Sequence, residues 1–133
     1  MGKILLALLI ILALIIAMPV NLASALNMEG TYFAYYEDED GLIEREKTAE
    51  QAKTDKDAYA VMFVTDAENF DKIADILGFE QTFSQMLDGE TILYGYSNKV
   101  LGGLRLNGRL VNIQIAIKND KLYVGSPLIV GWY

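Results

Sequence analysis

The stretch Arg109-Leu110-Val111-Asn112-Ile113-Gln114-Ile115-Ala116-Ile117-Lys118 decides the fold of this chain. Its β-branched residues return at every second position, which is the side-chain period of a β-strand. One face of this strand, which we expect to pack against a helix, carries Arg109, Val111, Ile113, Ile115 and Ile117. The other face, which we expect to be open to water, carries Leu110, Asn112, Gln114, Ala116 and Lys118.

Tight hairpin turns surround this strand. The dipeptides that favour such turns occur three times, as Asp88-Gly89, Asn107-Gly108 and Asn119-Asp120. The strands that they separate are residues 80–86, 90–97, 104–106, 109–118 and 121–124. Pro127 cannot donate to a strand ladder, so it marks an edge or bulge before a last apolar run at residues 128–132. This pattern predicts an antiparallel meander.

A strand and a helix precede the meander. Residues 59–64 are apolar on both faces and predict an inner strand. Thr65 or Asp66 then offers a side-chain oxygen to cap the start of a helix. The helix ends at Gly78 and presents one apolar stripe, formed by Phe70, Ile73, Ala74 and Leu77. We expect this helix to cover one face of the sheet.

An acidic segment separates the inner strand from an aromatic first strand at residues 31–36. Residues 37–57 have almost no apolar surface to bury, so we expect a mobile loop, with a solvent-exposed helix at residues 43–52 as an option. A calcium loop with Gly41 at its sixth position would need Tyr36 and Lys47 as ligands, and neither fits. The predicted fold class is therefore α+β: a curved antiparallel sheet with one helix packed on one face.

The first 25 residues have the form of a secretory signal peptide. Lys3 precedes an unbroken apolar run, Pro19 ends that run, and Ala23-Ser24-Ala25 offers the small residues that a signal peptidase recognises. We expect cleavage after Ala25. The alternative is an uncleaved anchor that recruits Val20, Leu22 and Leu26.

This interpretation divides the chain into three parts. Residues 1–25 are the signal peptide, residues 26–57 are a strand and the acidic loop, and residues 58–133 are the α+β domain. The distribution of charge changes at about residue 90 rather than at these boundaries. Residues 26–90 carry 5 basic and 17 acidic residues, whereas residues 91–133 carry 5 basic residues and one acid. A basic end could face a wall polymer or lipid head group, although a solvated acidic loop beside a neutral sheet is the simpler explanation.

Composition excludes most catalytic chemistry. The chain has no cysteine and no histidine, which removes thiol catalysis, disulfides, the usual general base near neutral pH and the commonest zinc ligands. Its serines therefore lack an activating histidine, and Gly102-Gly103 lacks the lysine and hydroxyl pair of a phosphate loop. We predict no catalytic residue, no metal site and no cofactor.

The predicted open face supplies the candidate binding residues. The hydroxyl, amide, amine and aromatic groups assigned to it are Tyr94, Tyr96, Asn112, Gln114, Lys118 and Tyr123. Such a mixture suits a flat or polymeric ligand, which it would bind by stacking and hydrogen bonding. The alternative is that polar residues simply face water on one side of an antiparallel sheet. That alternative explains Asn112 least well, because asparagine is a poor strand former.

Three segments of the C-terminal half occur in an informative order. They are Gly95-Tyr96-Ser97, residues 111–117 and residues 123–129, followed by the terminal Tyr133. This series resembles the YwmB family, exported TATA-box-binding-protein-like proteins of Gram-positive bacteria, and matches roughly its C-terminal repeat. The resemblance covers about residues 59–133 and implies a TBP-like half and an extracytoplasmic location. Nucleic acid is not an expected partner, because the candidate face has few cations to release counterions from a phosphate backbone.

These observations favour an exported protein that is secreted or extracytoplasmic and associated with the cell envelope. The leading hypothesis is a non-catalytic binding module that uses its open sheet face on an envelope component or protein partner. The alternative is a structural protein that forms a homodimer through the sheet edge or the open face, and a hydrolase is a distant third. Membrane contact is expected only transiently, through the signal peptide.

Overall fold

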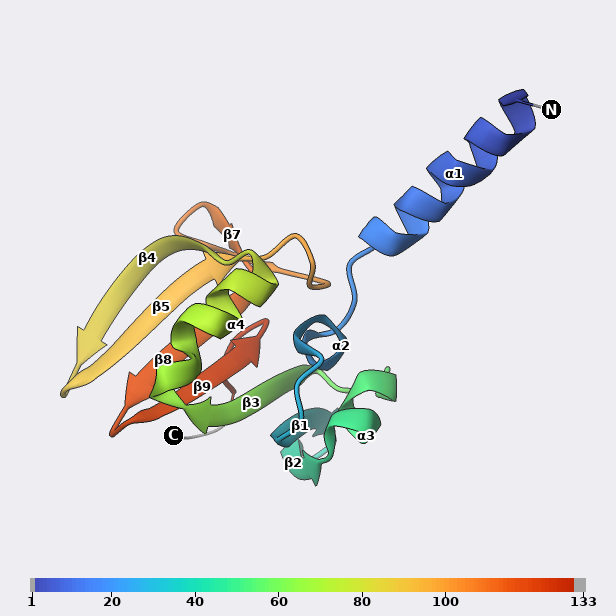
Figure 1. The fold of residues 1–133 in the computed structure, drawn as a ribbon. Helices are drawn as coiled ribbons and strands as arrows, with labels where there is room; N and C mark the ends of the chain where they lie inside the picture. The colour runs from blue at the N-terminus through green and yellow to red at the C-terminus, as the bar shows by residue number, and fades with distance from the viewer. Residues whose placement is uncertain (1, 131–133) are drawn as a thin grey trace.

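The computed structural model describes residues 2–130, apart from the side chains of residues 10–17. Its main element is a seven-stranded antiparallel sheet in the order β2-β1-β3-β9-β8-β5-β4, with helices packed on it (Figure 1). The predicted α+β class is thus confirmed. The strands of this sheet are β1 (Thr31–Asp38), β2 (Gly41–Lys47), β3 (Ala60–Asp66), β4 (Glu80–Leu87), β5 (Glu90–Tyr96), β8 (Ile113–Lys118) and β9 (Lys121–Ser126).

The other elements flank this sheet. Strands β6 (Leu104–Leu106) and β7 (Arg109–Val111) form a separate two-stranded hairpin. The helices are α1 (Gly2–Ala17), α2 (Leu22–Leu26), α3 (Ala49–Thr54) and α4 (Phe70–Leu77), with a short 3-10 turn at Ala67–Asn69. Helix α1 projects away from the rest of the chain (Figure 1).

The three predicted hairpin turns are all present. Asp88, Asn107 and Asn119 adopt positive φ angles of 50–51°, and the residue after each of them also has a positive φ. Turns with two such residues match the right-handed twist of the strands that they join, and Asn, Asp and Gly tolerate that conformation best. Local sequence therefore sets the β4–β5, β6–β7 and β8–β9 connections.

Helix α4 also forms where its apolar stripe predicts, and Gly78 ends it with a φ of 58°. The predicted cap is absent, however. The Asp66 carboxylate accepts a hydrogen bond from Lys121 Nζ at 2.8 Å, and Thr65 Oγ1 accepts one from Asn69 Nδ2 at 2.8 Å. A 3-10 turn separates β3 from α4, so Asp66 stands at the N-cap of that turn rather than of α4, and its side chain caps no backbone N–H there.

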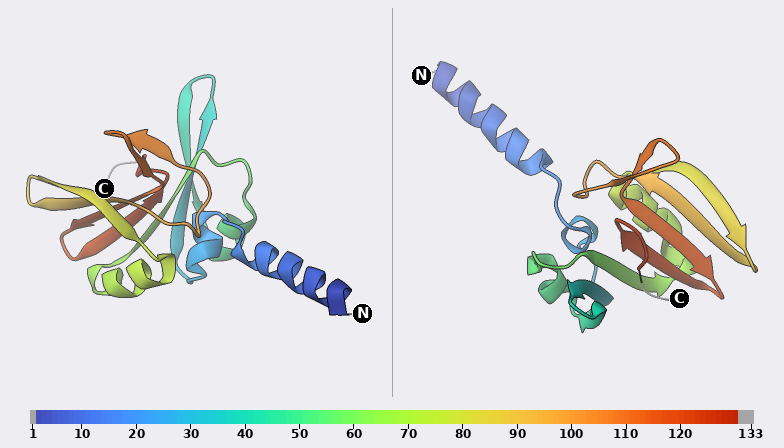
Figure 2. Two further views of the ribbon diagram at one scale, coloured as in Figure 1. Left: turned by 90° about the horizontal axis from the view of Figure 1, so that it is seen from above. Right: turned by 180° about the vertical axis from the view of Figure 1, so that it is seen from behind.

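One face of the sheet, here called the helical face, carries the main core. Ile113 and Ile115 are fully buried there, as the alternation predicts, opposite Ile73 and Leu77 of α4. Helices α2 and α3 contribute to the same core, so α4 is not the one helix packed on this face. The view from above shows α4 lying beneath the strands (Figure 2, left). Both extra helices are too short for a helical period to be visible in the sequence.

Residues 37–57 are not the mobile loop that their charge predicts. They extend β1, turn, return as β2, and then form α3, which starts with a capping box. In that box Thr48 Oγ1 accepts from the Gln51 backbone N–H at 3.2 Å, and Gln51 Oε1 accepts from the Thr48 N–H at 3.0 Å. Most of β2 is exposed, so its charged residues stay in water while its backbone pairs with β1.

The predicted boundary between residues 26–57 and 58–133 does not coincide with a division of the sheet. Strands β1 and β2 belong to the same sheet as the meander, so residues 26–57 do not form a separate part. On the N-terminal side, Leu22, Ala23 and Leu26 are at most 2% exposed and belong to the core of the helical face. The folded unit therefore extends N-terminal of residue 26 and includes α2.

Candidate functional site

The second face of the sheet, opposite the helices, is only partly open, because the end of the chain covers its β1, β3 and β9 part. Residues 127–130, here called the tail, turn back from β9 and lie across this face. Ile129 and Val130 of the tail pack against a small apolar cluster that includes Tyr35, Ala60 and Met62. The last apolar run forms no strand at residues 128–130, and residues 131–133 lie outside the described chain.

A glycine lets the tail come this close. A Cβ atom added to Gly125 would stand 2.8 Å from the backbone nitrogen of Ile129, a separation that real Cβ atoms essentially never show. Gln114, which pairs with Gly125 in the β8–β9 ladder, fixes the tail by accepting a hydrogen bond from the Ile129 N–H at 2.7 Å. Gln114 is only 7% exposed, so its amide serves the fold rather than a ligand.

Asn112 is likewise a structural residue. It is fully buried and interrupts the predicted strand of residues 109–118 between β7 and β8. Its Nδ2 donates to the carbonyl oxygens of Ser97 and Val100 at 2.8 and 2.9 Å, and its Oδ1 accepts from the Ser97 N–H at 2.8 Å. A buried polar side chain needs such partners, and here they fix the loop that follows β5. Its poor fit to a strand was the signal of this role.

The other four predicted residues do not converge on one site. Tyr94 stacks on Phe83, with ring centroids 4.5 Å apart, and donates to Gln85 Oε1 at 3.1 Å at the β4–β5 end of the sheet. Tyr123 packs against the apolar cluster beneath the tail. Lys118 pairs with Lys121 beside the β8–β9 turn, and Tyr96 lies at the end of β5, opposite Glu80. All four are partly buried.

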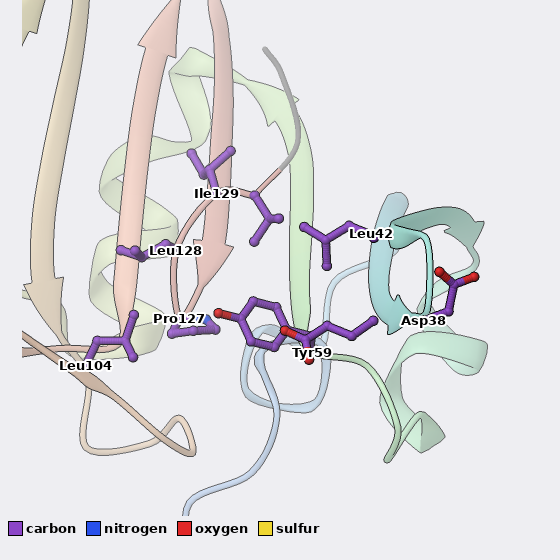
Figure 3. A pocket seen from close by; sticks show the side chains of 10 residues that line it. Asp38, Leu42, Tyr59, Leu104, Pro127, Leu128 and Ile129 are labelled. Atoms are coloured by element: carbon purple, nitrogen blue, oxygen red, sulfur yellow. The ribbon is translucent and has the colours of Figure 1, made fainter.

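The best candidate site is a groove between the β1–β2 hairpin and the tail, here called the tail groove. Its volume is about 380 Å³, and it is lined by Glu37, Asp38, Gly41, Leu42, Tyr59, Leu104 and residues 127–130. Leu42 points from the hairpin toward the tail, and Tyr59 lies between them (Figure 3). Leu42 is 50% exposed and Tyr59 is 49% exposed, so large apolar side chains remain accessible here.

Hydrogen bonds hold the hairpin wall of the groove and Tyr59 in position. The Tyr59 backbone N–H donates to the carbonyl oxygen of Tyr35 at 2.7 Å, which fixes Tyr59 beside β1. The Tyr36 hydroxyl donates to the Asp55 carboxylate, which also accepts from the backbone N–H groups of Asp57 and Ala58, each at 3.0 Å. This carboxylate therefore joins the hairpin to the segment that leads into Tyr59.

These contacts change two pKa values. Burial disfavours the charged form of Asp55, but the hydrogen bonds from Tyr36 and from two backbone N–H groups outweigh it and lower the pKa of this carboxyl. Burial and the neighbouring Asp55 carboxylate raise the pKa of Tyr36 to about 12. Both shifts preserve a neutral phenol that donates to an ionised carboxylate at neutral pH.

The groove combines apolar side chains with a few polar ones. Its side-chain polar groups are two exposed carboxylates and one exposed phenol. Among residues 2–130, no group of three or more acidic side chains is arranged to hold a metal ion. Sequence reasoning missed this groove because it depends on the tail folding back and on β2 forming, and Pro127 was the single local signal of the first.

Comparisons with known proteins add no assignment. A scan against family models, a search of curated proteins and a search of solved structures each found no match. In the described part of the chain, no helix is both long enough and apolar enough to cross a membrane. The structure therefore shows an α+β domain, and none of the three comparisons indicates a function for it.

Proposed function

We propose that this protein is a non-catalytic binding module of the cell envelope and that its ligand is an extended polypeptide segment with apolar and basic side chains. The observation that carries the proposal is the pair of half-exposed side chains, Leu42 and Tyr59, that line the tail groove. A cavity of about 380 Å³ falls in the range used by small ligands and side-chain anchors. A ligand that covers these side chains gains the hydrophobic free energy that folding has left unused.

The charge of the groove selects the kind of ligand. Glu37 and Asp38 line the groove, and Glu39 and Asp40 follow them at the tip of the hairpin. Four consecutive carboxylates create a local negative potential, which attracts a cation and repels an anionic polymer. We therefore expect a basic, partly apolar peptide as the ligand, rather than an anionic wall polymer or lipid head group.

The envelope location rests on different support. It draws on the N-terminal apolar segment with its single lysine and on the resemblance to an exported family. We also propose that the sheet is TBP-like, because the same family resemblance implies it.

Peptide binding to the full chain in a mild detergent tests the groove. We expect a fluorescent nine-residue peptide of alternating Leu and Lys to bind, and a peptide of alternating Leu and Glu to bind at least tenfold more weakly. Leu42→Asp should abolish binding of the first peptide. Ile43→Asp is the matched control, because Ile43 is also exposed on β2 but does not line the groove. Equal binding of both peptides, or equal loss in both variants, would remove the proposal.

The structure of the sheet edges favours a homodimer as the second candidate function. Edge strand β2 carries four consecutive charged residues, Glu44 to Lys47, which discourage pairing with another strand. The opposite edge strand, β4, is uncharged from Gln81 to Leu87, and Met86 is 73% exposed. The part of this edge from Ser84 to Leu87 is a template for antiparallel pairing with a second copy, whereas the part near Gln81 has a register irregularity and its Thr82 carbonyl oxygen accepts from the Arg109 guanidinium at 3.0 Å. Light scattering of the full chain in detergent should show a dimer that Ser84→Lys converts to a monomer, and a monomeric wild type would exclude this candidate.

A further inference from the structure

We infer that the chain is not cut after Ala25 and that α1 inserts into a lipid bilayer, where it anchors the folded domain at the membrane surface. The inference deepens the proposed envelope location and rests on that part of the proposed function alone. The tail groove and its ligand play no part in it.

Helix α1 presents apolar side chains in every direction. Successive residues of a helix point in different directions, and 55–69% of each large apolar side chain near its start is exposed, at Ile4, Leu5, Leu6, Leu8 and Leu9. Residues 4–18 contain no polar residue, and Lys3 is the sole charge at the N-terminal end. A protein partner covers one stripe of a helix, whereas a bilayer covers its whole circumference, so a lipid phase is the occupant that fits. The helix has 16 residues and is about 24 Å long, so α1 would reach about 24 Å into the bilayer.

The segment that follows α1 is built into the domain by backbone pairing. The Val20 N–H donates to the carbonyl oxygen of Lys99 at 3.0 Å, and the Leu101 N–H donates to the carbonyl oxygen of Val20 at 2.8 Å. These bonds join the N-terminal segment to the loop that Asn112 fixes from the other side through Ser97 and Val100. The attachment point of α1 is therefore part of a bonded network.

Asn21 adds a second attachment, at the C-terminal end of α3. Its Nδ2 lies 3.0, 3.2 and 3.4 Å from the carbonyl oxygens of Ala52, Lys53 and Asp55, and its Oδ1 accepts from the Ser24 N–H at 2.9 Å. One amide thus caps the start of α2 and satisfies the end of α3. A cut after Ala25 would remove this residue from the domain.

Two residues on the N-terminal side of the predicted cleavage point are buried in the core. Leu22 and Ala23 are 1% and 0% exposed in the core of the helical face, between α3, α4 and the sheet. A cut after Ala25 removes both side chains and leaves their space in the core that α2 shares with α3, α4 and β3 unfilled. Leu22 and Leu26 are also unavailable to lengthen a membrane helix, because the core already holds them. Membrane insertion must therefore stop before α2.

The surface around the junction suits contact with a membrane. Met18, Val20 and Leu101 are 62%, 40% and 54% exposed, and backbone bonds hold Val20 and Leu101 side by side. This apolar collar surrounds the point where α1 leaves the domain. A domain held by α1 at a bilayer surface would bring the collar against the interface, where apolar side chains are stabilised.

Fractionation of cells that express the full chain tests both parts of the inference. Intact mass spectrometry of each fraction should show the complete chain in the membrane fraction, resistant to extraction by alkaline carbonate. A released species of residues 26–133 would overturn retention while supporting export. Complete chain in the soluble cytoplasmic fraction would overturn insertion, and with it the proposed envelope location. A failed peptide-binding experiment would affect neither result, so the two proposals can fail separately.

Flotation with neutral phosphatidylcholine vesicles isolates insertion from cellular sorting. Purified full chain should float with the vesicles, and Leu5→Lys/Leu8→Lys should lower the bound fraction by about tenfold or more, since a lysine inside the bilayer is costly. Ile43→Lys/Leu110→Lys is the matched control, because it places two lysines on exposed apolar positions outside α1, the tail groove and the β4 edge. Equal flotation of both variants would show that α1 does not insert. Loss of flotation in the control alone would overturn the inference as well.

Discussion

Replacing Asn112 by alanine should destabilise the whole domain, because three buried backbone groups lose their partner. The Ser97 N–H and the carbonyl oxygens of Ser97 and Val100 lie 2.8–2.9 Å from the Asn112 side chain, and Ser97 and Val100 are at most 3% exposed. Leaving a buried polar group unsatisfied costs about 1–3 kcal/mol. At about 1–1.5 kcal/mol for each group, the free energy of unfolding should fall by about 3–5 kcal/mol.

Urea unfolding of the full chain in a mild detergent measures this loss. With a slope of about 2 kcal/mol per molar urea, a fall of about 4 kcal/mol lowers the unfolding midpoint by about 2 M. Asn98→Ala is the control, since Asn98 is an exposed turn residue, and it should change stability by less than about 0.5 kcal/mol. A loss below about 1 kcal/mol for Asn112→Ala, or equal losses for both variants, would refute the structural role and revive the ligand-binding interpretation.

Two further perturbations address the tail and the hairpin. Gly125→Ala puts a methyl group 2.8 Å from the backbone nitrogen of Ile129, so the tail should lift, exchange of the Ile129 amide hydrogen should accelerate, and stability should fall by about 1–3 kcal/mol. Unchanged exchange at Ile129 would contradict the close approach. Because folding lowers the pKa of Asp55, its carboxylate stabilises the fold above the ordinary value of 3.8 and loses this effect as pH falls through the folded pKa. Asp55→Asn should therefore be less stable than wild type at pH 7 and approach it in strong acid, and a stability gap that is independent of pH in urea titrations would disprove this linkage.

Local signals predicted the elements that pack strongly or turn tightly. The stripe from Phe70 to Leu77 favours a helix, and Asp88-Gly89, Asn107-Gly108 and Asn119-Asp120 favour hairpins, and the structure has both. The alternation around Ile113 and Ile115 likewise identified the helical face correctly. These features depend on a few neighbouring residues, so the sequence displays them directly.

The missed features depend on partners far away in the chain. Strand β2 has charged residues on an exposed surface, and it forms because β1 extends to pair with it. Helix α2 has five residues, and the predicted cleavage point after Ala25 falls inside it because the core partners of Leu22 and Leu26 are not visible locally. Alternation placed Gln114 on the second face correctly, but it could not show that the tail would cover that face.

The candidate binding site likewise depends on contacts between distant parts of the chain. The sequence identified residues able to bind a ligand, yet Asn112 and Gln114 use their amides inside the fold. An amide that faces a ligand and an amide that satisfies a buried backbone have the same local pattern. The tail groove required the positions of β2, Tyr59 and residues 127–130 together, and no single segment carries that information.

Amide hydrogen exchange on the full chain in detergent micelles tests most directly whether α2 belongs to the folded domain. The N–H groups of Ser24, Ala25 and Asn27 donate to Asn21 Oδ1, the Asn21 carbonyl oxygen and the Ala23 carbonyl oxygen at 2.9, 3.0 and 2.9 Å. If Leu22 and Ala23 are core residues, these three amides should exchange as slowly as those of β3 and β9. Rapid exchange at all three, with β3 and β9 still protected, would contradict the account.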